Sequence, residues 1–134
     1  MKSGFSISWL SSIQPRKQRK YRLNAPLHRK GKMVNVHLSK ELRKKYGTRS
    51  VRVRKGDKVM VMSGQFKGKS GTVDRVDVQR EKIFVTGVEN VKKDGAKVLY
   101  PLHPSKIMIT TLYTDDKKRF KKFSTNQTET KQNG

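Results

Sequence analysis

The fold is decided by the segment Lys55–Val76, which reads KGDKVMVMSGQFKGKSGTVDRV. An apolar-rich run is followed by a loop with three glycines and then by a second run with valines, a pattern that predicts two strands joined by a tight turn. The glycines permit a positive φ and a close approach between backbones. Lys67 and Lys69 flank Gly68, so their ammonium groups lie beside exposed backbone N–H groups and can dock on phosphates. The alternative is that the glycines serve only the turn.

Further runs of the same kind extend this unit to five strands. We expect strands at residues 58–62, 70–78, 82–86, 96–100 and 106–110. Val73 lies out of phase with Val76 and Val78, which predicts a bulge or bend, and Asp94–Gly95 is a hairpin signal. Five short strands with tight turns are typical of a small, mostly β barrel that is closed on its own edges. The expected interior residues are Val59, Val61, Val73, Val76, Ile83, Val85, Val98, Ile107 and Ile109.

Basic residues dominate the composition and are concentrated near the N-terminus. The 134 residues include 33 Lys and Arg against 10 Asp and Glu, a formal net charge of +23, and the first 55 positions hold 17 of these basic residues and one acid. A polyanion relieves such self-repulsion, and nucleic acid is the leading candidate because each neutralised phosphate releases a condensed counterion. An anionic membrane surface is the weaker alternative, because the chain has no long amphipathic helix with an apolar face.

The chain is expected to have three parts. Residues 1–50 form a basic arm with short helices, residues 51–113 form the barrel, and residues 114–134 form a polar, basic C-terminal tail. The tail can begin a helix near Asp115. From about Ser124 onward its polar composition predicts a flexible, disordered segment.

Two short helices are predicted within the arm. One covers residues 14–21, where Pro15 occupies a favoured first position. The other covers residues 40–46, with Ser39 as N-cap and Gly47 just past its end. One edge of this second helix is apolar and can rest on the barrel, so that its basic face is free for a partner. The apolar edge consists of Leu38, Leu42 and Tyr46.

The sequence offers no chemistry for catalysis or metal binding. It contains no cysteine, which excludes disulfides, zinc ribbons and thiol catalysis and fits an intracellular setting. The three histidines are scattered among few carboxylates, so neither a metal nor another cofactor is expected. Asp74 and Asp77 lie close together on one predicted strand, as a catalytic pair of carboxylates would. Because Arg75 and lysines are nearby, ion pairs at the solvated surface are the better interpretation. No run of about 18 apolar residues occurs, so no membrane insertion is expected.

The segment Lys55–Val76 resembles the KOW motif in residue type and spacing. In that family the strand–loop–strand unit is part of an SH3-like barrel, and a glycine at the position of Gly68 is its hallmark. The resemblance therefore implies an SH3-like (KOW) barrel. The motif alone does not distinguish ribosomal proteins from transcription elongation factors.

The N-terminal arm distinguishes ribosomal proteins from transcription elongation factors. Residues 14–22, 24–28, 38–47 and 103–106 resemble the archaeal and eukaryotic branch of one ribosomal family, large-subunit protein twenty-four in bacterial counting and twenty-six in eukaryotic counting. The resemblance covers residues 14 to about 112, and the loop around Gly68 looks archaeal. It implies a cytoplasmic, ribosome-bound structural constituent that binds the 5′ region of large-subunit ribosomal RNA, joins assembly early and lies near the nascent-chain tunnel exit. Neighbouring large-subunit ribosomal proteins, and nascent-chain targeting factors at the exit, are the further candidate partners.

RNA contacts are expected mainly from basic side chains, because Arg can bridge phosphate oxygens and Lys acts as a point charge. Tyr21 is a candidate for base stacking, Phe66 for a turn anchor or an RNA contact, and Trp9 for stacking or for packing on a neighbouring protein. The candidate RNA-binding residues of the arm are Arg16, Lys17, Arg19, Lys20, Tyr21, Arg22, Asn24, His28, Arg29, Lys30, Lys32, Lys40, Arg43, Lys44, Lys45 and Arg49. Those that follow the arm are Arg52, Arg54, Lys55, Ser63, Gly64, Phe66, Lys67, Gly68, Lys69, His103 and Lys106.

Two other functions remain open from the residues alone. A KOW-type transcription elongation factor or another RNA-binding factor could carry the same motif, although an elongation factor would normally have a larger partner-binding domain. An enzyme acting on RNA would need an acid or a metal site. The sequence has no nucleophile–base arrangement and no nucleotide-binding glycine signature, so enzymatic activity is not expected.

Overall fold

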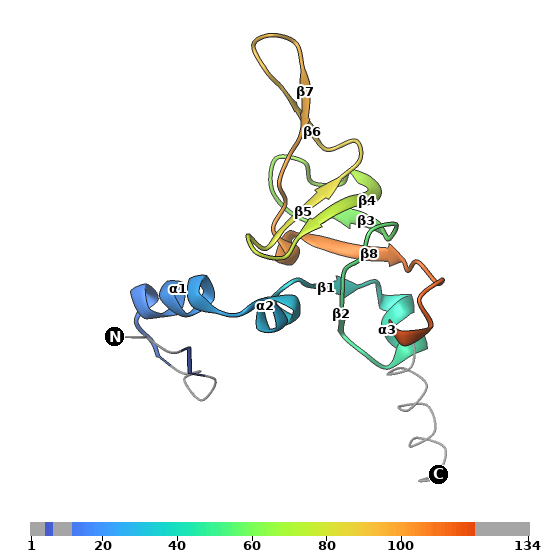
Figure 1. Ribbon diagram of the computed structural model, residues 1–134. Helices are drawn as coiled ribbons and strands as arrows, with labels where there is room; N and C mark the ends of the chain where they lie inside the picture. The colour runs from blue at the N-terminus through green and yellow to red at the C-terminus, as the bar shows by residue number, and fades with distance from the viewer. Residues whose placement is uncertain (1–4, 7–11, 120–134) are drawn as a thin grey trace, which may run out of the picture.

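The protein is mostly β, with a six-stranded sheet, a separate two-stranded hairpin and short helices near the N-terminus (Figure 1). The computed structural model describes residues 5–6 and 12–119. Within these residues no helix is long and apolar enough to cross a membrane. The elements in chain order are α1 (Pro15–Asn24), α2 (Leu27–Met33), β1 (Asn35–Leu38), α3 (Lys40–Tyr46), β2 (Ser50–Arg52), β3 (Lys58–Val61), β4 (Ser70–Asp77), β5 (Lys82–Val85), β6 (Glu89–Val91), β7 (Lys97–Leu99), a short 3-10 turn (Pro104–Lys106) and β8 (Ile107–Thr111).

The segment Lys55–Val76 forms the expected strand–loop–strand unit. β3 and β4 pair antiparallel, with Lys58 opposite Thr72. β4 then pairs with β5, and the register shifts between Val73 and Arg75. This irregularity confirms the bulge predicted from the phase of Val73. A bulge bends a strand, so β4 can pair with β3 at its beginning and with β5 over the remainder.

β1 and β2 were not predicted from the sequence. β1 runs parallel to β8 and antiparallel to β2, and it lies between them in the sheet. Val34, Val36 and Leu38 are fully buried. Their two-residue spacing is the pattern of a half-buried strand, but the basic residues on either side hid this signal. Part of the basic N-terminal region therefore belongs to the sheet.

The core contains most of the expected interior residues. Seven of the nine are buried, and Val76 is half-buried against them. The prediction was wrong for Val98, which is 43% exposed. Its strand, β7, pairs with β6 in the hairpin, and Figure 1 shows this hairpin projecting away from the sheet. Val98 therefore lies outside the core cluster of the described residues.

The expected closure into a barrel is not present in the strand pairing of residues 12–119. The strand order is β2–β1–β8–β3–β4–β5, and the two outer strands do not pair with each other. The fourth predicted strand, residues 96–100, contains β7, which pairs with β6 in the hairpin and not with the six-stranded sheet. A single bridge between Ile83 and Leu102 extends the sheet beyond β5. The six-stranded sheet is therefore open.

Both helices predicted for the arm are present, and α2 lies between them. α1 has no buried residue, as expected for a helix without an apolar stripe. At the start of α3 the Ser39 side chain accepts a hydrogen bond from the Leu42 amide, and Gly47 ends the helix with a φ of 64°. Leu42 and Tyr46 pack against the core, which confirms the apolar edge. Trp9 and the tail beyond residue 119 lie outside the described residues.

The carboxylate of Asp57 is fully buried and joins three segments of the chain. It accepts hydrogen bonds from the backbone amides of Arg54 and Tyr113, at 2.8 and 2.9 Å. Both terminal guanidinium nitrogens of Arg119 donate to it at 2.8 Å, and one of them also donates to the Arg52 carbonyl at 2.9 Å. The turn between β2 and β3, the chain after β8 and the segment with Arg119 therefore meet at one buried ion pair.

Replacement of Asp57 by alanine is expected to lower the free energy of unfolding by about 3–5 kcal/mol. The change leaves the Arg119 guanidinium buried without its counter-ion and two backbone amides without an acceptor. The control is Asp74→Ala, which removes a carboxylate that is 45% exposed and lies 3.9 Å from the Lys55 ammonium. That loss should not exceed about 1 kcal/mol. Urea denaturation measures both variants, and equal losses would contradict the role given to Asp57.

Candidate nucleic-acid interface

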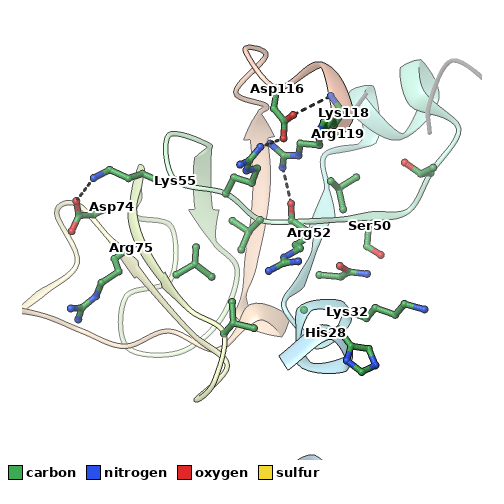
Figure 2. A pocket seen from close by; sticks show the side chains of 18 residues that line it. His28, Lys32, Ser50, Arg52, Lys55, Asp74, Arg75, Asp116, Lys118 and Arg119 are labelled. Atoms are coloured by element: carbon green, nitrogen blue, oxygen red, sulfur yellow. Dashed lines mark hydrogen bonds and ion pairs between the residues drawn. The ribbon is translucent and has the colours of Figure 1, made fainter. Parts of the chain in front are cut away.

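A groove of about 1410 Å³ is lined by residues of α2, β2, β4 and the segment 116–119. We call it the α2–β4 groove. Figure 2 shows Asp74 and Arg75 on one side of it and His28 and Lys32 on the other. The groove therefore brings together parts of the arm, of the sheet and of the chain that follows β8.

The lining of the α2–β4 groove is strongly basic. Its cations are Lys32, Arg52, Arg54, Lys55, Arg75, Lys118 and Arg119, and its carboxylates are Asp74 and Asp116. Arg54 forms an ion pair with Asp116, and Lys55 lies 3.9 Å from Asp74. Both carboxylates are thus already engaged by groove cations. Arg119 is paired with the buried Asp57 carboxylate, and the other groove cations keep their positive charge available to an anion.

The groove contains predicted and unpredicted residues. The predicted RNA-binding residues in its lining are His28, Lys32, Arg52, Arg54 and Lys55. Sequence reasoning did not select Arg75 and Lys118, because one was interpreted as a strand residue paired with carboxylates and the other as part of the tail. Arg75 also covers the Phe84 ring, at 4.3 Å from its centroid. Only tertiary pairing brings these two cations to the arm, so no local signal could have identified them.

α1 presents its predicted cations to solvent and is held at its C-terminal end. The side chains of Arg16, Lys17, Arg19 and Lys20 are exposed. Arg22 forms an ion pair with Glu81, which is 7% exposed, and its guanidinium lies 3.3 Å from Nε2 of His103. Arg22 thus ties the helix to the turn before β5. Glu81 was not selected from the sequence, since a single acid near a turn carries no signal of its own.

Tyr21 and Phe66 both pack within the protein. The ring of Tyr21 lies 4.7 Å from that of Phe5, at an interplanar angle of 37°. Phe66 is 7% exposed, and its ring lies 5.0 Å from that of Tyr100. Phe66 therefore anchors the loop, whereas half-buried Tyr21 keeps part of its surface accessible.

Neighbouring basic residues of α2 have different surroundings. Lys30 is buried, and its ammonium donates to the Gln79 carbonyl at 3.0 Å. Lys32 is exposed at the groove. The Arg52 guanidinium lies over Gly31, where a Cβ atom would approach Nη1 to 2.8 Å. Lys30 thus ties α2 to the β4–β5 turn, and the absent side chain of Gly31 leaves room for Arg52.

The glycine loop forms a second basic surface. Gly64 and Gly68 have φ values of 98° and 85°, which favour glycine. Lys67 and Lys69 are exposed, and the Lys69 ammonium lies 5.1 Å above the Phe66 ring. Lys106 approaches the same loop, because its ammonium lies 3.9 Å from where a Cβ of Gly64 would be. Ser63 is exposed beside them.

α3 contributes a third group of predicted residues. Lys40, Lys44 and Lys45 are exposed, as is Arg49 after the helix. Arg43 is half-buried, and its Nε donates to the Leu38 carbonyl at 2.8 Å. The predicted basic face is thus present on α3, with Arg43 fixed to the end of β1.

Burial lowers the pKa of His103, and the nearby Arg22 guanidinium lowers it further. Nδ1 of His103 lies 2.8 Å from the Ser105 hydroxyl. Among residues 5–6 and 12–119, no group of three or more His, Cys, Asp or Glu side chains is placed to hold a metal ion.

Comparisons with known proteins identify the family of this chain. The sequence model of a family described as ribosomal proteins L26 in eukaryotes and L24 in archaea matches residues 12–125. The chain is also 48% identical, over 110 residues, to "Large ribosomal subunit protein uL24" of Korarchaeum cryptofilum (strain OPF8), covering 82% of this chain and 84% of that protein. The chain belongs to this ribosomal protein family. The match to the family model includes α1, the glycine loop and the α2–β4 groove.

Replacement of Gly71 by alanine is expected to destabilise the protein by about 1–3 kcal/mol. A Cβ at this position would overlap the backbone carbonyl oxygen of Thr86 and come within 2.8 Å of the Val85 side chain, so strands β4 and β5 would have to separate. Ser70→Ala, at the exposed neighbouring position, is the control and should change stability by less than about 0.5 kcal/mol. Thermal denaturation compares the two. A neutral Gly71→Ala would show that the strands tolerate the extra methyl group.

Acidification is expected to destabilise the fold through His103. The pKa of His103 is lower in the folded protein than the ordinary value of 6.5, so the unfolded chain takes up the proton first as the pH falls. The free energy of unfolding should therefore decline as the pH falls through the ordinary histidine value of 6.5 toward the lower pKa of the folded protein. His103→Gln should remove part of this decline. Identical stability–pH curves with and without His103 would refute the assignment.

Proposed function

We propose that this chain is a structural, non-catalytic constituent of the large ribosomal subunit and binds large-subunit ribosomal RNA through its basic surfaces. The observation that carries the proposal is the family match over residues 12–125, which spans both the arm and the sheet. The Korarchaeum relative is named as a protein of the large ribosomal subunit. We infer the same ribosome-bound, cytoplasmic place for this chain.

RNA binding would be mainly electrostatic. The four exposed cations of α1, the loop with Lys67 and Lys69, and the α2–β4 groove offer separate sets of donors to phosphates. Each phosphate contact releases condensed counterions, and Arg can bridge two phosphate oxygens. The sheet then acts as a rigid body, and α1 acts as a strap that Arg22 fixes at one end.

The segment Lys55–Val76 would act as a KOW unit within an SH3-like arrangement. Its support is the pairing of β3 with β4, the positive φ of Gly68 and the buried anchor Phe66 beneath the loop. This arrangement holds the loop backbone and its lysines in a fixed position. The loop can therefore contact a phosphate ribbon with little loss of conformational freedom.

The more specific assignments rest on the family resemblance. They are binding to the 5′ region of the RNA, early entry into assembly and a place near the nascent-chain tunnel exit. Neighbouring large-subunit proteins are the proposed protein partners. Targeting factors at the tunnel exit would use surfaces that RNA leaves open, such as the projecting β6–β7 hairpin (Figure 1).

Sedimentation of a cell extract through a sucrose gradient tests the ribosomal role. The protein is expected to comigrate with the large subunit at moderate salt. Recovery only as free protein, or with RNA polymerase and without ribosomal RNA, would overturn the proposal and favour a KOW-type transcription factor. An RNA cleavage assay with and without divalent metal should show no turnover.

The electrostatic mechanism predicts a steep salt dependence. If about 6–10 phosphates are neutralised, the affinity for ribosomal RNA should fall by about 10³–10⁵ between about 50 and about 200 mM salt. The test variant is K17Q/R19Q/K20Q on α1, and the matched control is K92Q/K93Q/K97Q, at exposed lysines in and beside the β6–β7 hairpin. The α1 variant should make the slope of log affinity against log salt shallower by roughly 3. A slope unchanged by that variant would exclude α1 from the phosphate contacts.

A further inference from the structure

We propose that the α2–β4 groove holds an unpaired stretch of RNA, with bases against its apolar floor and phosphates on its basic rim. The inference rests on the proposed RNA-binding function and deepens it, because it names the form of RNA that this part of the surface takes. The proposal applies to the groove only, and the basic surfaces on α1 and on the glycine loop can bind phosphates of paired or unpaired RNA.

The floor of the groove is apolar. Val51 and Val53 from the β2 region are buried, and Val76 and Val78 from the β4 region are half-buried. A site for phosphates alone has no need of this surface. In a duplex the faces of the bases are covered by stacking, whereas an unpaired base can turn its flat face toward a protein. Val76 and Val78, which keep part of their surface exposed, offer such a base an apolar contact without aromatic stacking.

The rim of the groove complements the phosphates that flank such bases. Figure 2 places Arg75 on one side and Lys32 on the other, so a strand lying between them would have cations on both sides. Within the described residues, Lys32 and Lys118 form no ion pair. The groove therefore has cations that are not committed to the fold.

Polar groups near the floor can bind base edges. Asn35 and Ser50 are exposed and line the groove. The Thr48 hydroxyl oxygen, also in the lining, is buried and has no hydrogen-bond partner in the described structure. Buried polar atoms are normally hydrogen-bonded. Because this oxygen has almost no accessible surface, the Thr48 side chain would have to rotate before a ligand in the groove could supply the missing partner.

The size of the groove favours a polymer over a small molecule. Its volume of about 1410 Å³ exceeds the range of about 300–1,000 Å³ that is usual for small-ligand pockets. Several linked nucleotides fill such a space, and their backbone follows its length. The rival occupant is the phosphate ribbon of an RNA duplex, which would touch the rim and leave the valines uncovered.

Binding of the full chain to two RNA probes tests the proposal. One probe is a fully paired RNA duplex, and the other is the same duplex interrupted by an unpaired internal loop. Val78→Glu places a carboxylate on the floor, and Val91→Glu is the matched control at a position that is 68% exposed on the hairpin. The unchanged protein should prefer the looped probe, and Val78→Glu should weaken binding to that probe about tenfold. Binding to the duplex should change little, as should both affinities of Val91→Glu.

A second pair of variants covers the case in which Val78→Glu fails to fold, as judged by thermal denaturation. The rim variant K32Q/K118Q is compared with K92Q/K97Q, which removes the same charge from the hairpin region. Only the rim variant should abolish protection of the loop nucleotides from chemical modification in the complex. Loop protection that survives in the rim variant would place the loop elsewhere and overturn the proposal.

The remaining outcomes separate this proposal from the ribosomal role. Equal affinity of the unchanged protein for the two probes would overturn the groove assignment in favour of the duplex, even if the protein comigrates with the large subunit. A loop preference that depends on Val78, in a protein that does not comigrate with the large subunit, would instead support the groove and refute the ribosomal role.

Discussion

The buried pair of Asp57 and Arg119 is the interaction on which the rest of the structure depends. In a chain with a net charge of +23, an uncompensated cation in the interior would be costly, and a fully buried carboxylate offers it a partner in fixed geometry. Asp57 lies in the turn that leads into β3, and Arg119 comes from the segment that lines the α2–β4 groove. The pair therefore stabilises the fold and also holds one part of the groove in position.

The basic residues of the molecule fall into two groups, those that bind other parts of the fold and those that are exposed to solvent. Arg22, Lys30 and Arg43 are bound to a carboxylate or to backbone carbonyls, so they connect helices to the sheet. Lys32 and the four cations that precede Tyr21 in α1 are exposed and remain available to a ligand. A count of Lys and Arg residues does not separate these two groups. In a strongly basic protein the binding surface is therefore smaller than the number of Lys and Arg residues suggests, because the fold itself uses several of them.

Local signals predicted the elements whose structure is locally determined. The β3–loop–β4 unit and α3 each have a turn or cap residue at the required place, and both formed as expected. β1 was missed although Val34, Val36 and Leu38 alternate, because the surrounding charge obscured a short pattern. The position of β7 could not be predicted from its residues, because the sequence of an apolar strand does not determine which strand it pairs with. The same limit applies to Asp57 and to Glu81, whose roles arise from residues distant in the sequence.

The turn between β4 and β5 explains how the groove keeps its shape. Gln79 accepts the hydrogen bond from Lys30 of α2, and Glu81 holds Arg22 of α1. The same turn is continuous with β4, which supplies other lining residues of the groove. Glu81 takes a φ of 55°, a conformation that non-glycine residues adopt only when their surroundings enforce it. Because one turn fixes α2 relative to β4, the groove is formed before any ligand arrives, and less conformational entropy is lost on binding. In the proposed RNA complex, a preformed groove would select RNA by shape as well as by charge, and this would let a strongly basic surface distinguish an unpaired strand from a duplex.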